Sequence, residues 1–367
     1  MKPRRYQLRK DAVAIVAGGH PWLFRDHLSS AASVFRDGDW LRLVDGANQV
    51  IGHGLYEAEG AIAIRVLRTG AGAPDAAWWR DRLAAAIARR RELAGHTDGI
   101  RLVHGESDGV PAVVVDRFGD ALVVASYSAG ADALARYTAR ALPTLDAAVV
   151  GPAAHVILRP ARRRRGPLVA ARVLRGAPVE LARFTEDGLT FAVDLAAGHK
   201  TGTYLDLRGL RRALRQDRTA RIDDTGALAQ MPLAGARVLN LFAYTGMLGR
   251  AAEAAGAAEI VQVDQSERAL DFARAHHVGD AARHRFLVAD AFHYTYAPTE
   301  QYDLVIVDPP SMTSRVDQVP RVLATYRKLY AQLAPHVRPG GALVAACCTS
   351  RVPRGKFHEA VRAGLGS

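Results

Sequence analysis

The chain has 367 residues, of which 49% are hydrophobic and 23% are charged, and its formal net charge is +12. This length exceeds what one hydrophobic core usually organises, and the composition excludes wholesale disorder, so we expect two or three folded domains. The excess positive charge favours a polyanionic partner such as nucleic acid, although an arginine-rich surface without such a partner would give the same balance.

The start of the chain, MKPRRYQLRKDAVAIVAGGHPW, has no continuous apolar core of the length that a signal peptide requires, and no later stretch could cross a bilayer. We therefore expect a cytoplasmic protein with no membrane partner. The two cysteines, Cys347 and Cys348, are adjacent. Neighbouring residues rarely form a good disulfide and two thiols are too few for a structural zinc site, so no metal is expected and the thiols are either buried or reactive.

The first part of the chain contains short apolar runs separated by turn residues. The runs WLRLVD, QVIGHGLYE and AIAIRVL lie between Trp40 and Leu67 and predict a small all-β domain over residues 1–70. The segment TGAGAPDA, at residues 69–76, predicts a linker because it has neither periodicity nor bulk.

The next part combines helices and strands. Helical spacing of apolar residues predicts helices over residues 77–94 and around residues 131–142, with two hairpin strands between them joined at residues 118–120. These features predict an α+β middle domain over residues 71–184. It contains a dense basic run that is either a solvated loop or a set of phosphate contacts. The central residues of this run are Arg162, Arg163, Arg164 and Arg165.

From Gly235 onward, near-continuous runs of Val, Ile and Leu alternate with helical patterns. Examples are ARVLNLF, EIVQVD and QYDLVIV for the strands and SERALDFARAHH for a helix. This alternation predicts an α/β domain over residues 185–367, in which helices cover both faces of a parallel sheet. Ligands bind such sheets at the carboxyl ends of the strands, and the candidate site residues lie there.

Candidate cofactor residues follow three of these strands. The turn after the first strand contains a glycine, which lets the backbone approach a nucleotide-like ligand closely. The aspartate that ends the second strand either accepts from both hydroxyls of a ribose or caps a helix. The aspartate after the third strand either accepts from an adenine amino group, with a phenylalanine packed on the ring, or caps a loop. These residues are Asn240, Phe242, Tyr244 and Gly246, then Asp264, then Asp290 and Phe292. No GxGxxG motif is present, which argues against a nicotinamide cofactor.

Two further strand ends carry groups suited to chemistry. Asp308 and Pro309 begin the run DPP, a stiff turn that aims the aspartate at a planar substrate, unless the prolines merely stop the strand. Cys348 ends the following strand, and alternation sends Cys347 and Cys348 to opposite faces. A lone cysteine is usually a buried structural thiol, so the pattern alone does not favour catalysis by Cys348.

Several longer motifs occur in a characteristic order and spacing. They are HPWLF (20–24), GESDGVPAVVVDRFG (105–119), GHKTGTYLDLR (198–208), VLNLFAYTG (238–246), VDQSERALDFAR (263–274), DPP (308–310) and CCTS (347–350). With them, nearly the whole chain resembles the bacterial and archaeal large-subunit ribosomal RNA cytosine carbon-5 methyltransferases. Those enzymes consist of a PUA domain, a middle domain and a Rossmann-like class I methyltransferase domain.

The resemblance implies S-adenosylmethionine as the cofactor and RNA as the partner, either 23S ribosomal RNA or a large-subunit precursor. It aligns Cys348 with the family's nucleophile, and Lys200 and Asp308 would join it in catalysis. Thr201, Tyr204 and Pro309 would bind the cofactor together with the strand-end residues above. The PUA domain and the basic run would hold RNA.

The chemistry explains why a cysteine is needed. Carbon 5 of cytosine is a poor nucleophile, so a thiolate first adds to carbon 6, and the thiolate is later eliminated when a base removes the carbon 5 proton. A free thiol has a pKa of about 8.5, so its surroundings must favour ionisation, and the cofactor sulfonium and Lys200 are the candidate causes. Asp308 would hydrogen-bond the ring edge, and the target base must be unpaired or flipped out.

The chain departs from the family's pattern at three places. The family has a bulky aromatic residue soon after DPP, whereas Ser311, Met312 and Thr313 stand here. The segment after Ala273 lacks the family's asparagine. The sequence ends at Ser367, where the family continues through a final β-hairpin that completes the sheet edge, so we expect a shortened natural variant, an edge covered in a homodimer, or an impaired enzyme.

Two other functions fit the same residues. DPP turns also serve methyl transfer to a guanine nitrogen or another RNA base, which needs no cysteine. A noncatalytic RNA-binding or ribosome-assembly protein would keep the cofactor fold without the reaction.

Overall fold

The computed structural model describes residues 3–161, 170–198, 200–216, 218–220, 228–230, 232–293 and 300–366. Contacts within the chain divide it into two compact units, Met1–Leu205 and Asp206–Ser367. Within the described ranges, no helix has the length and apolar character needed to cross a membrane.

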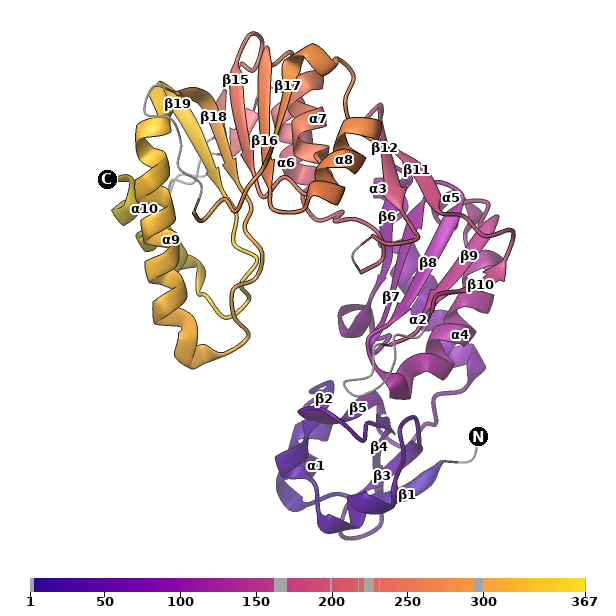
Figure 1. Cartoon of the computed structure of the whole chain (residues 1–367). Coiled ribbons are helices and arrows are strands. Elements are labelled where there is room, and N and C mark those ends of the chain that lie inside the picture. The colour runs from indigo at the N-terminus through magenta and orange to yellow at the C-terminus, as the bar shows by residue number, and fades with distance from the viewer. Residues whose placement is uncertain are drawn as a thin grey trace. The chain divides into compact units, whose positions relative to one another are not determined.

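The first domain of unit 1 is a five-stranded sheet with strand order β1-β3-β4-β5-β2 (Figure 1). Its core includes the fully buried Leu23, Leu41, Leu43 and Ile64. The three predicted strands are present as β3, β4 and β5. The sequence pattern missed β1, α1 and β2 because each buries only one or two side chains, too few to make a periodic pattern. The elements are β1 (Arg4–Gln7), α1 (Lys10–Ala17), β2 (Trp22–Phe24), β3 (Trp40–Val44), β4 (Val50–Tyr56) and β5 (Ile62–Thr69).

The middle domain is a second five-stranded sheet, β10-β9-β8-β7-β6, packed with short helices. The predicted hairpin is β7–β8, in which Phe118 pairs with Ala121. The predicted helix over residues 77–94 is two helices, because the backbone at Arg90 leaves the helical region and its guanidinium pairs with the buried Asp108. The elements are α2 (Ala76–Ala88), α3 (Arg91–Ala94), β6 (Gly99–His104), β7 (Val113–Phe118), β8 (Ala121–Ser126), α4 (Asp132–Ala141), α5 (Ala147–Val150), β9 (His155–Arg159) and β10 (Arg172–Arg175).

A hairpin of β11 (Leu181–Glu186) and β12 (Leu189–Asp194) follows the middle sheet. Phe184 of β11 packs against Phe118 of β7, with 5.8 Å between the ring centroids, which attaches the hairpin to the middle domain. The predicted domain boundary between residues 184 and 185 falls inside this hairpin. The contacts place the division after Leu205, because the hairpin packs on β6 and β7.

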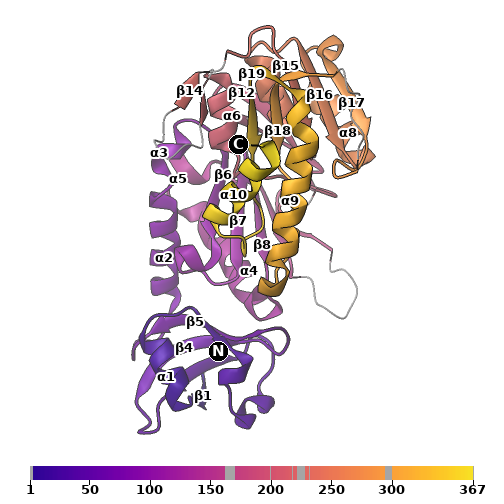
Figure 2. The same ribbon diagram turned by 90° about the vertical axis from the view of Figure 1, so that its left-hand side faces the viewer.

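Unit 2 contains the predicted parallel sheet, in the order β17-β16-β15-β18-β19. Consecutive side chains of β15 point to opposite faces. Leu239 packs with helices α9 and α10, and Val238 packs with α6 and α7, so both faces are covered. Figure 2 shows α9 and α10 side by side. The elements are α6 (Arg208–Arg215), β13 (Arg218–Ala220), β14 (Leu228–Gln230), β15 (Arg237–Leu241), α7 (Met247–Ala254), β16 (Glu259–Asp264), α8 (Glu267–His276), β17 (His284–Val288), β18 (Tyr302–Val307), α9 (Val319–Leu333), β19 (Val337–Ala345) and α10 (Arg354–Leu365).

The strand order fixes where a ligand binds. The chain runs from β15 outward to β16 and β17, then continues with β18 on the other side of β15 and with β19 beyond it. Ligands of such sheets bind at the carboxyl ends of the strands where this order reverses, which here are the ends of β15 and β18.

Candidate active site

The turn between β15 and α7 has an unusual backbone. Phe242, Tyr244 and Gly246 all have positive φ values, 59°, 47° and 75°. A Cβ atom on Gly246 would lie 2.8 Å from Cβ of Ala273 and 2.8 Å from Oε1 of Gln262, so a larger residue does not fit there. Left-handed backbone at two aromatic residues is costly and is concentrated at ligand sites in proteins.

Asp264, at the end of β16, holds this turn in place. Its Oδ2 accepts a hydrogen bond from the Tyr244 backbone N–H at 2.8 Å, and its Oδ1 accepts from the Ser266 N–H at 2.9 Å. The cap of helix α8 is Ser266 rather than Asp264, because the Ser266 hydroxyl accepts from the Ala269 N–H. Each carboxylate oxygen of Asp264 has a second lone pair, which suits the paired hydroxyls of a ribose.

Asp290 and Phe292 lie beyond the end of β17. Asp290 is exposed, and its carboxylate accepts from the Phe292 N–H at 3.0 Å and interacts with His293 Nδ1 at 2.9 Å. The bonds with His293 and the Phe292 N–H hold the pKa of Asp290 below its usual value. The Phe292 ring lies 4.9 Å from that of Phe242, so this pair joins two of the strand ends. Asp290 therefore does cap its turn, while Phe292 supplies an aromatic surface.

Asn240 lies inside the sheet rather than at the surface of the strand ends. Its side chain is 0% exposed, and its Nδ2 donates to Gln262 Oε1 at 3.4 Å. Its Oδ1 has no hydrogen-bond partner among the described residues, which is costly for a buried acceptor. The left-handed turn and the lone pairs of Asp264, rather than the buried Asn240, are features that a nucleoside-bearing cofactor would satisfy.

Asp308 and Cys348 meet at the ends of the neighbouring strands β18 and β19. The Cys348 thiol donates a hydrogen bond to Asp308 Oδ1 at 3.4 Å, and Pro309 is buried beside it. Cys347 lies elsewhere: it packs against the core of unit 2, and its sulfur accepts from the Tyr326 hydroxyl at 3.5 Å. The two adjacent thiols therefore have different surroundings, and Cys348 is the one paired with the DPP aspartate.

The surroundings of Cys348 disfavour ionisation of its thiol, whereas the proposed chemistry predicts surroundings that favour it. The Cys348 side chain is exposed, but the protein atoms packed around its sulfur partly desolvate it. This desolvation, together with the charge of Asp308 and the hydrogen bond to it, raises the pKa of Cys348 to about 12, and Asp206 adds to this effect. Burial also raises the pKa of Asp308. The hydrogen bond from Cys348 lowers this pKa in part, and the charge of Asp206 raises it further. Sequence analysis did not single out Asp206, although it belongs to the motif GHKTGTYLDLR.

Lys200, Thr201 and Tyr204 form a separate group in unit 1. Lys200 has a positive φ of 53°, and its Nζ lies 4.9 Å from the centroid of the Tyr204 ring. Thr201 is fully buried, and its hydroxyl donates to Asp116 Oδ2 at 2.5 Å. The hydroxyl of Thr201 thus binds a residue of the middle domain, whereas the resemblance assigns Thr201 to cofactor binding.

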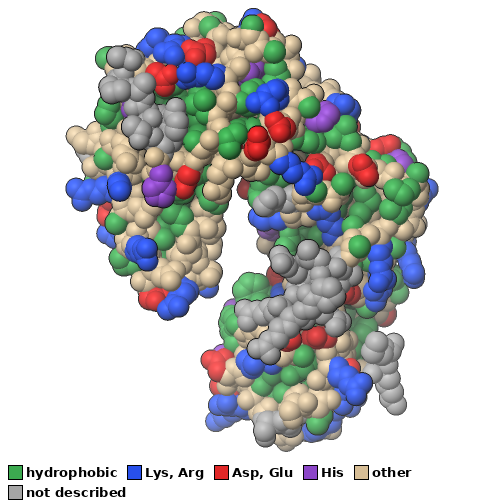
Figure 3. Space-filling view, viewed as in Figure 1, with side chains coloured by type: hydrophobic (Ala, Val, Ile, Leu, Met, Phe, Trp, Pro, Cys, Tyr) green, Lys and Arg blue, Asp and Glu red, His purple; other side chains and the backbone are tan. Residues whose placement is uncertain are grey.

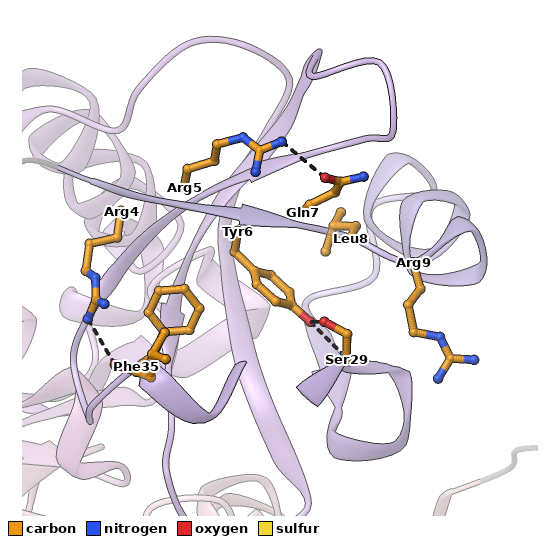
Figure 4. A pocket seen from close by; sticks show the side chains of 9 residues that line it. Arg4, Arg5, Tyr6, Gln7, Leu8, Arg9, Ser29 and Phe35 are labelled. Carbon is orange, nitrogen blue, oxygen red and sulfur yellow. Dashed lines mark hydrogen bonds between the residues drawn. The ribbon is translucent and has the colours of Figure 1, made fainter. Parts of the chain in front are cut away.

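A basic hollow on the first domain was not predicted. It has a volume of about 880 Å³ and lies along strand β1, which pairs on one side only, with β3. Arg4 and Phe35 lie at one end of it and Arg9 at the other, with Tyr6 between them (Figure 4). Arg4 pairs with Asp39, Arg9 with Asp11, and Arg5 hydrogen-bonds Asn48.

Among the described side chains on the face shown in Figure 3, basic ones are interspersed with acidic ones. The predicted RNA-binding run, Arg162 to Arg165, lies outside the described residues. Among the described residues, no group of three or more His, Cys, Asp and Glu side chains is arranged to hold a metal ion.

The chain is similar to known methyltransferases over most of its length. The family described as "S-adenosylmethionine-dependent methyltransferase" matches residues 102–361, and that described as "PUA-like domain" matches residues 7–69. A "Ribosomal RNA large subunit methyltransferase" of Deinococcus radiodurans is 32% identical, covering 98% of this chain and 88% of the relative. The "Ribosomal RNA large subunit methyltransferase I" of Serratia proteamaculans is 30% identical, covering 93% and 84%.

Solved structures show the same fold. A methyltransferase complexed with SAH superimposes with a TM-score of 0.78 at 21% identity, covering 98% of this chain and 90% of the other. A SAM-dependent methyltransferase from Streptococcus mutans gives a TM-score of 0.77 at 21% identity, covering 99% and 90%.

Proposed function

The chain belongs to the S-adenosylmethionine-dependent methyltransferase family and carries an N-terminal PUA-like domain, and from this premise we propose that it methylates carbon 5 of a cytosine in large-subunit ribosomal RNA. The relatives above, which are named for large-subunit ribosomal RNA, support the substrate. The observation that carries the cytosine assignment is the pairing of Cys348 with Asp308, because carbon 5 chemistry requires a nucleophile beside the base.

S-adenosylmethionine, when bound, supplies a methyl group on a positively charged sulfonium. The residues proposed to hold it are those of the strand ends, with Asp264 for the ribose, Asp290 for the adenine amino group and the Phe242–Phe292 pair for the ring. The left-handed turn would let the backbone approach the same ligand closely.

The reaction proposed for the protein side chains follows from the thiol and its carboxylate. The thiol proton passes to Asp308, whose raised pKa makes it a suitable acceptor, and the thiolate of Cys348 adds to carbon 6. The resulting electron pair makes carbon 5 nucleophilic, and the protonated Asp308 stabilises the ring edge. After carbon 5 is methylated, a base removes its proton, the carbon–sulfur bond breaks, and Cys348 leaves as a thiolate.

The RNA around the target is proposed to contact the basic hollow along β1 and the run Arg162 to Arg165. Arginines beside a strand edge suit a phosphate backbone. The target base must be single-stranded or flipped to reach the thiol.

Tritiated methyl transfer to unmodified 23S ribosomal RNA tests this function. After digestion to nucleosides, the label should migrate with 5-methylcytidine. Labelled methylguanosine would instead support the alternative of a guanine nitrogen, which the high pKa of Cys348 favours because that reaction needs no thiolate. Absence of any label would favour a noncatalytic RNA-binding protein.

A further inference from the structure

The segment between β12 and the end of unit 1 has a tightly determined backbone. Lys200 has a φ of 53° and Gly202 a φ of 140°. A Cβ atom on Gly202 would lie 2.3 Å from Val193 Cγ1, and one on Gly198 would lie 2.2 Å from the Asp194 carbonyl oxygen. Gly198 and Gly202 therefore pass so close to β12 that few other conformations fit there.

Arg159, at the end of β9, binds this segment from the side of the middle sheet. Its guanidinium donates to the carbonyl oxygens of Leu195 at 2.6 Å and Gly198 at 3.0 Å, and also to that of Lys200. One side chain thus holds three carbonyls of the same segment, in the fork geometry that only arginine provides.

Asp116, on β7, provides a second attachment. Its carboxylate is 0% exposed and is paired through both oxygens with Arg101, at 2.7 and 2.8 Å. The same carboxylate accepts the hydroxyl of Thr201 at 2.5 Å. A buried carboxylate is tolerated only when it is paired and hydrogen-bonded, so the bond to Thr201 helps to satisfy a costly group.

We propose that Asp116 and Arg159 are positioning residues, which fix the backbone of residues 195–198 and 200–203 so that Lys200 is held in one conformation with its ammonium over the ring of Tyr204. This inference rests on the proposed function in one respect, because the resemblance assigns Lys200 a part in the proposed methyl transfer. Lys200 lies between the two attachments, because its own carbonyl binds Arg159 and the next residue binds Asp116. Its left-handed backbone costs energy and persists because its own carbonyl and the following residue, Thr201, are held.

Hydrogen exchange on the full chain tests the attachment without reference to activity. Arg159→Met and Thr201→Val should each raise amide exchange in residues 195–203, and Thr201→Ser, which keeps the hydroxyl, should restore most of the protection in that segment. Arg172→Met is the matched control, because Arg172 is exposed on the neighbouring strand β10. Unchanged exchange in both Arg159→Met and Thr201→Val would overturn the proposal.

A double-mutant cycle in methyl transfer tests the link to Lys200. Arg159→Met should lower kcat by about tenfold in the wild-type background and by less than about twofold in a Lys200→Met background, since the effect acts through Lys200. If Arg159→Met acted only by a general loss of stability, it would lower kcat by the same factor in both backgrounds, and that result would overturn the proposal. The absence of any effect of Lys200→Met on kcat would also overturn it. If the wild-type protein methylates no RNA, the proposed function fails while the exchange experiment still decides on the attachment.

Discussion

The Cys348 thiol donates a hydrogen bond to Asp308 across 3.4 Å, between the ends of two neighbouring parallel strands. This pairing distinguishes Cys348 from the adjacent Cys347, which contacts Tyr326 in the core. It also keeps the thiol protonated in the absence of other ligands, since the pKa of Cys348 is raised to about 12 by partial desolvation of the sulfur and by the charge of Asp308. A positive charge nearby would lower that pKa, and the cofactor's sulfonium supplies one.

Alkylation of Cys348 should therefore depend on charge at the site. In a Cys347→Ala background, Asp308→Asn removes a negative charge and should lower the pKa of Cys348. The thiolate fraction at about pH 9 then rises about tenfold for every full unit by which this pKa falls, and iodoacetamide should modify the thiol about threefold faster per unit, because a less basic thiolate is also a weaker nucleophile. Saturating S-adenosylmethionine should also raise the rate relative to SAH, whose sulfur carries no charge. Equal rates for wild type and Asp308→Asn would show that Asp308 does not control the thiol.

Asp264 should contribute strongly to cofactor affinity. Asp264→Ala removes the acceptor for the ribose and also the bond that holds the Tyr244 backbone, so S-adenosylmethionine should bind at least about tenfold more weakly, or about 1.4 kcal/mol. Titration calorimetry measures this directly. Asp271→Ala serves as the control, since Asp271 is an exposed residue of α8 paired with Arg274. Unchanged affinity in Asp264→Ala would remove Asp264 from the site.

Two glycines with nearly the same φ offer a matched comparison of the turn. Substitution of Gly246 (75°) or Gly235 (74°) by alanine should lower the free energy of unfolding by about 1 kcal/mol in each case, because an alanine at this φ is strained. Only at Gly246 would the new methyl group meet Ala273 and Gln262, so Gly246→Ala should lower the Tm further than Gly235→Ala and should weaken cofactor binding as well. Equal Tm values for the two variants would mean that the turn has room for a side chain.

The fold of unit 2 could be predicted because its strands are recorded in local patterns. The run that becomes β18 is apolar on both faces, and polar residues stand at the ends of β16, β18 and β19, so Asp264, Asp308 and Cys348 could be placed from sequence. By contrast, β1 and β2 bury one residue each and left no pattern to detect.

The features that the sequence could not indicate depend on contacts between distant residues. Asp116 and Thr201 are 85 residues apart, and no local pattern connects them. The burial of Asn240 follows from its hydrogen bond to Gln262 on the neighbouring strand. The pKa of Cys348 depends on the carboxylates of Asp308, which follows β18, and Asp206, which precedes α6. These residues are far from Cys348 in the sequence, so no local pattern connects them with the thiol.

RNA binding should decrease when the hollow along β1 loses its charge. Replacing Arg4, Arg5 and Arg9 by glutamine should weaken binding to every RNA tested and reduce the slope of log K against log salt by up to about 2, since each single-stranded phosphate contact contributes about 0.7. Filter binding at several salt concentrations measures both. Replacing Arg162 to Arg165 should act in the same way.

The control removes the same number of charges from another surface. Arg80, Arg136 and Arg140 are exposed on helices α2 and α4, and their replacement by glutamine should leave the slope close to that of the wild type. If the control variant and the β1 variant have the same slope, the effect is one of net charge and the hollow is not an RNA site.

The covalent role of Cys348 is tested most directly with RNA that contains 5-fluorocytosine at the target. Fluorine replaces the proton that must leave carbon 5, so elimination stalls after methyl transfer and a protein–RNA adduct should survive denaturing electrophoresis. Wild type and Cys347→Ala should form this adduct, whereas Cys348→Ala should form none and should not methylate unmodified RNA. Methylation by Cys348→Ala at nearly the wild-type rate would contradict the covalent mechanism.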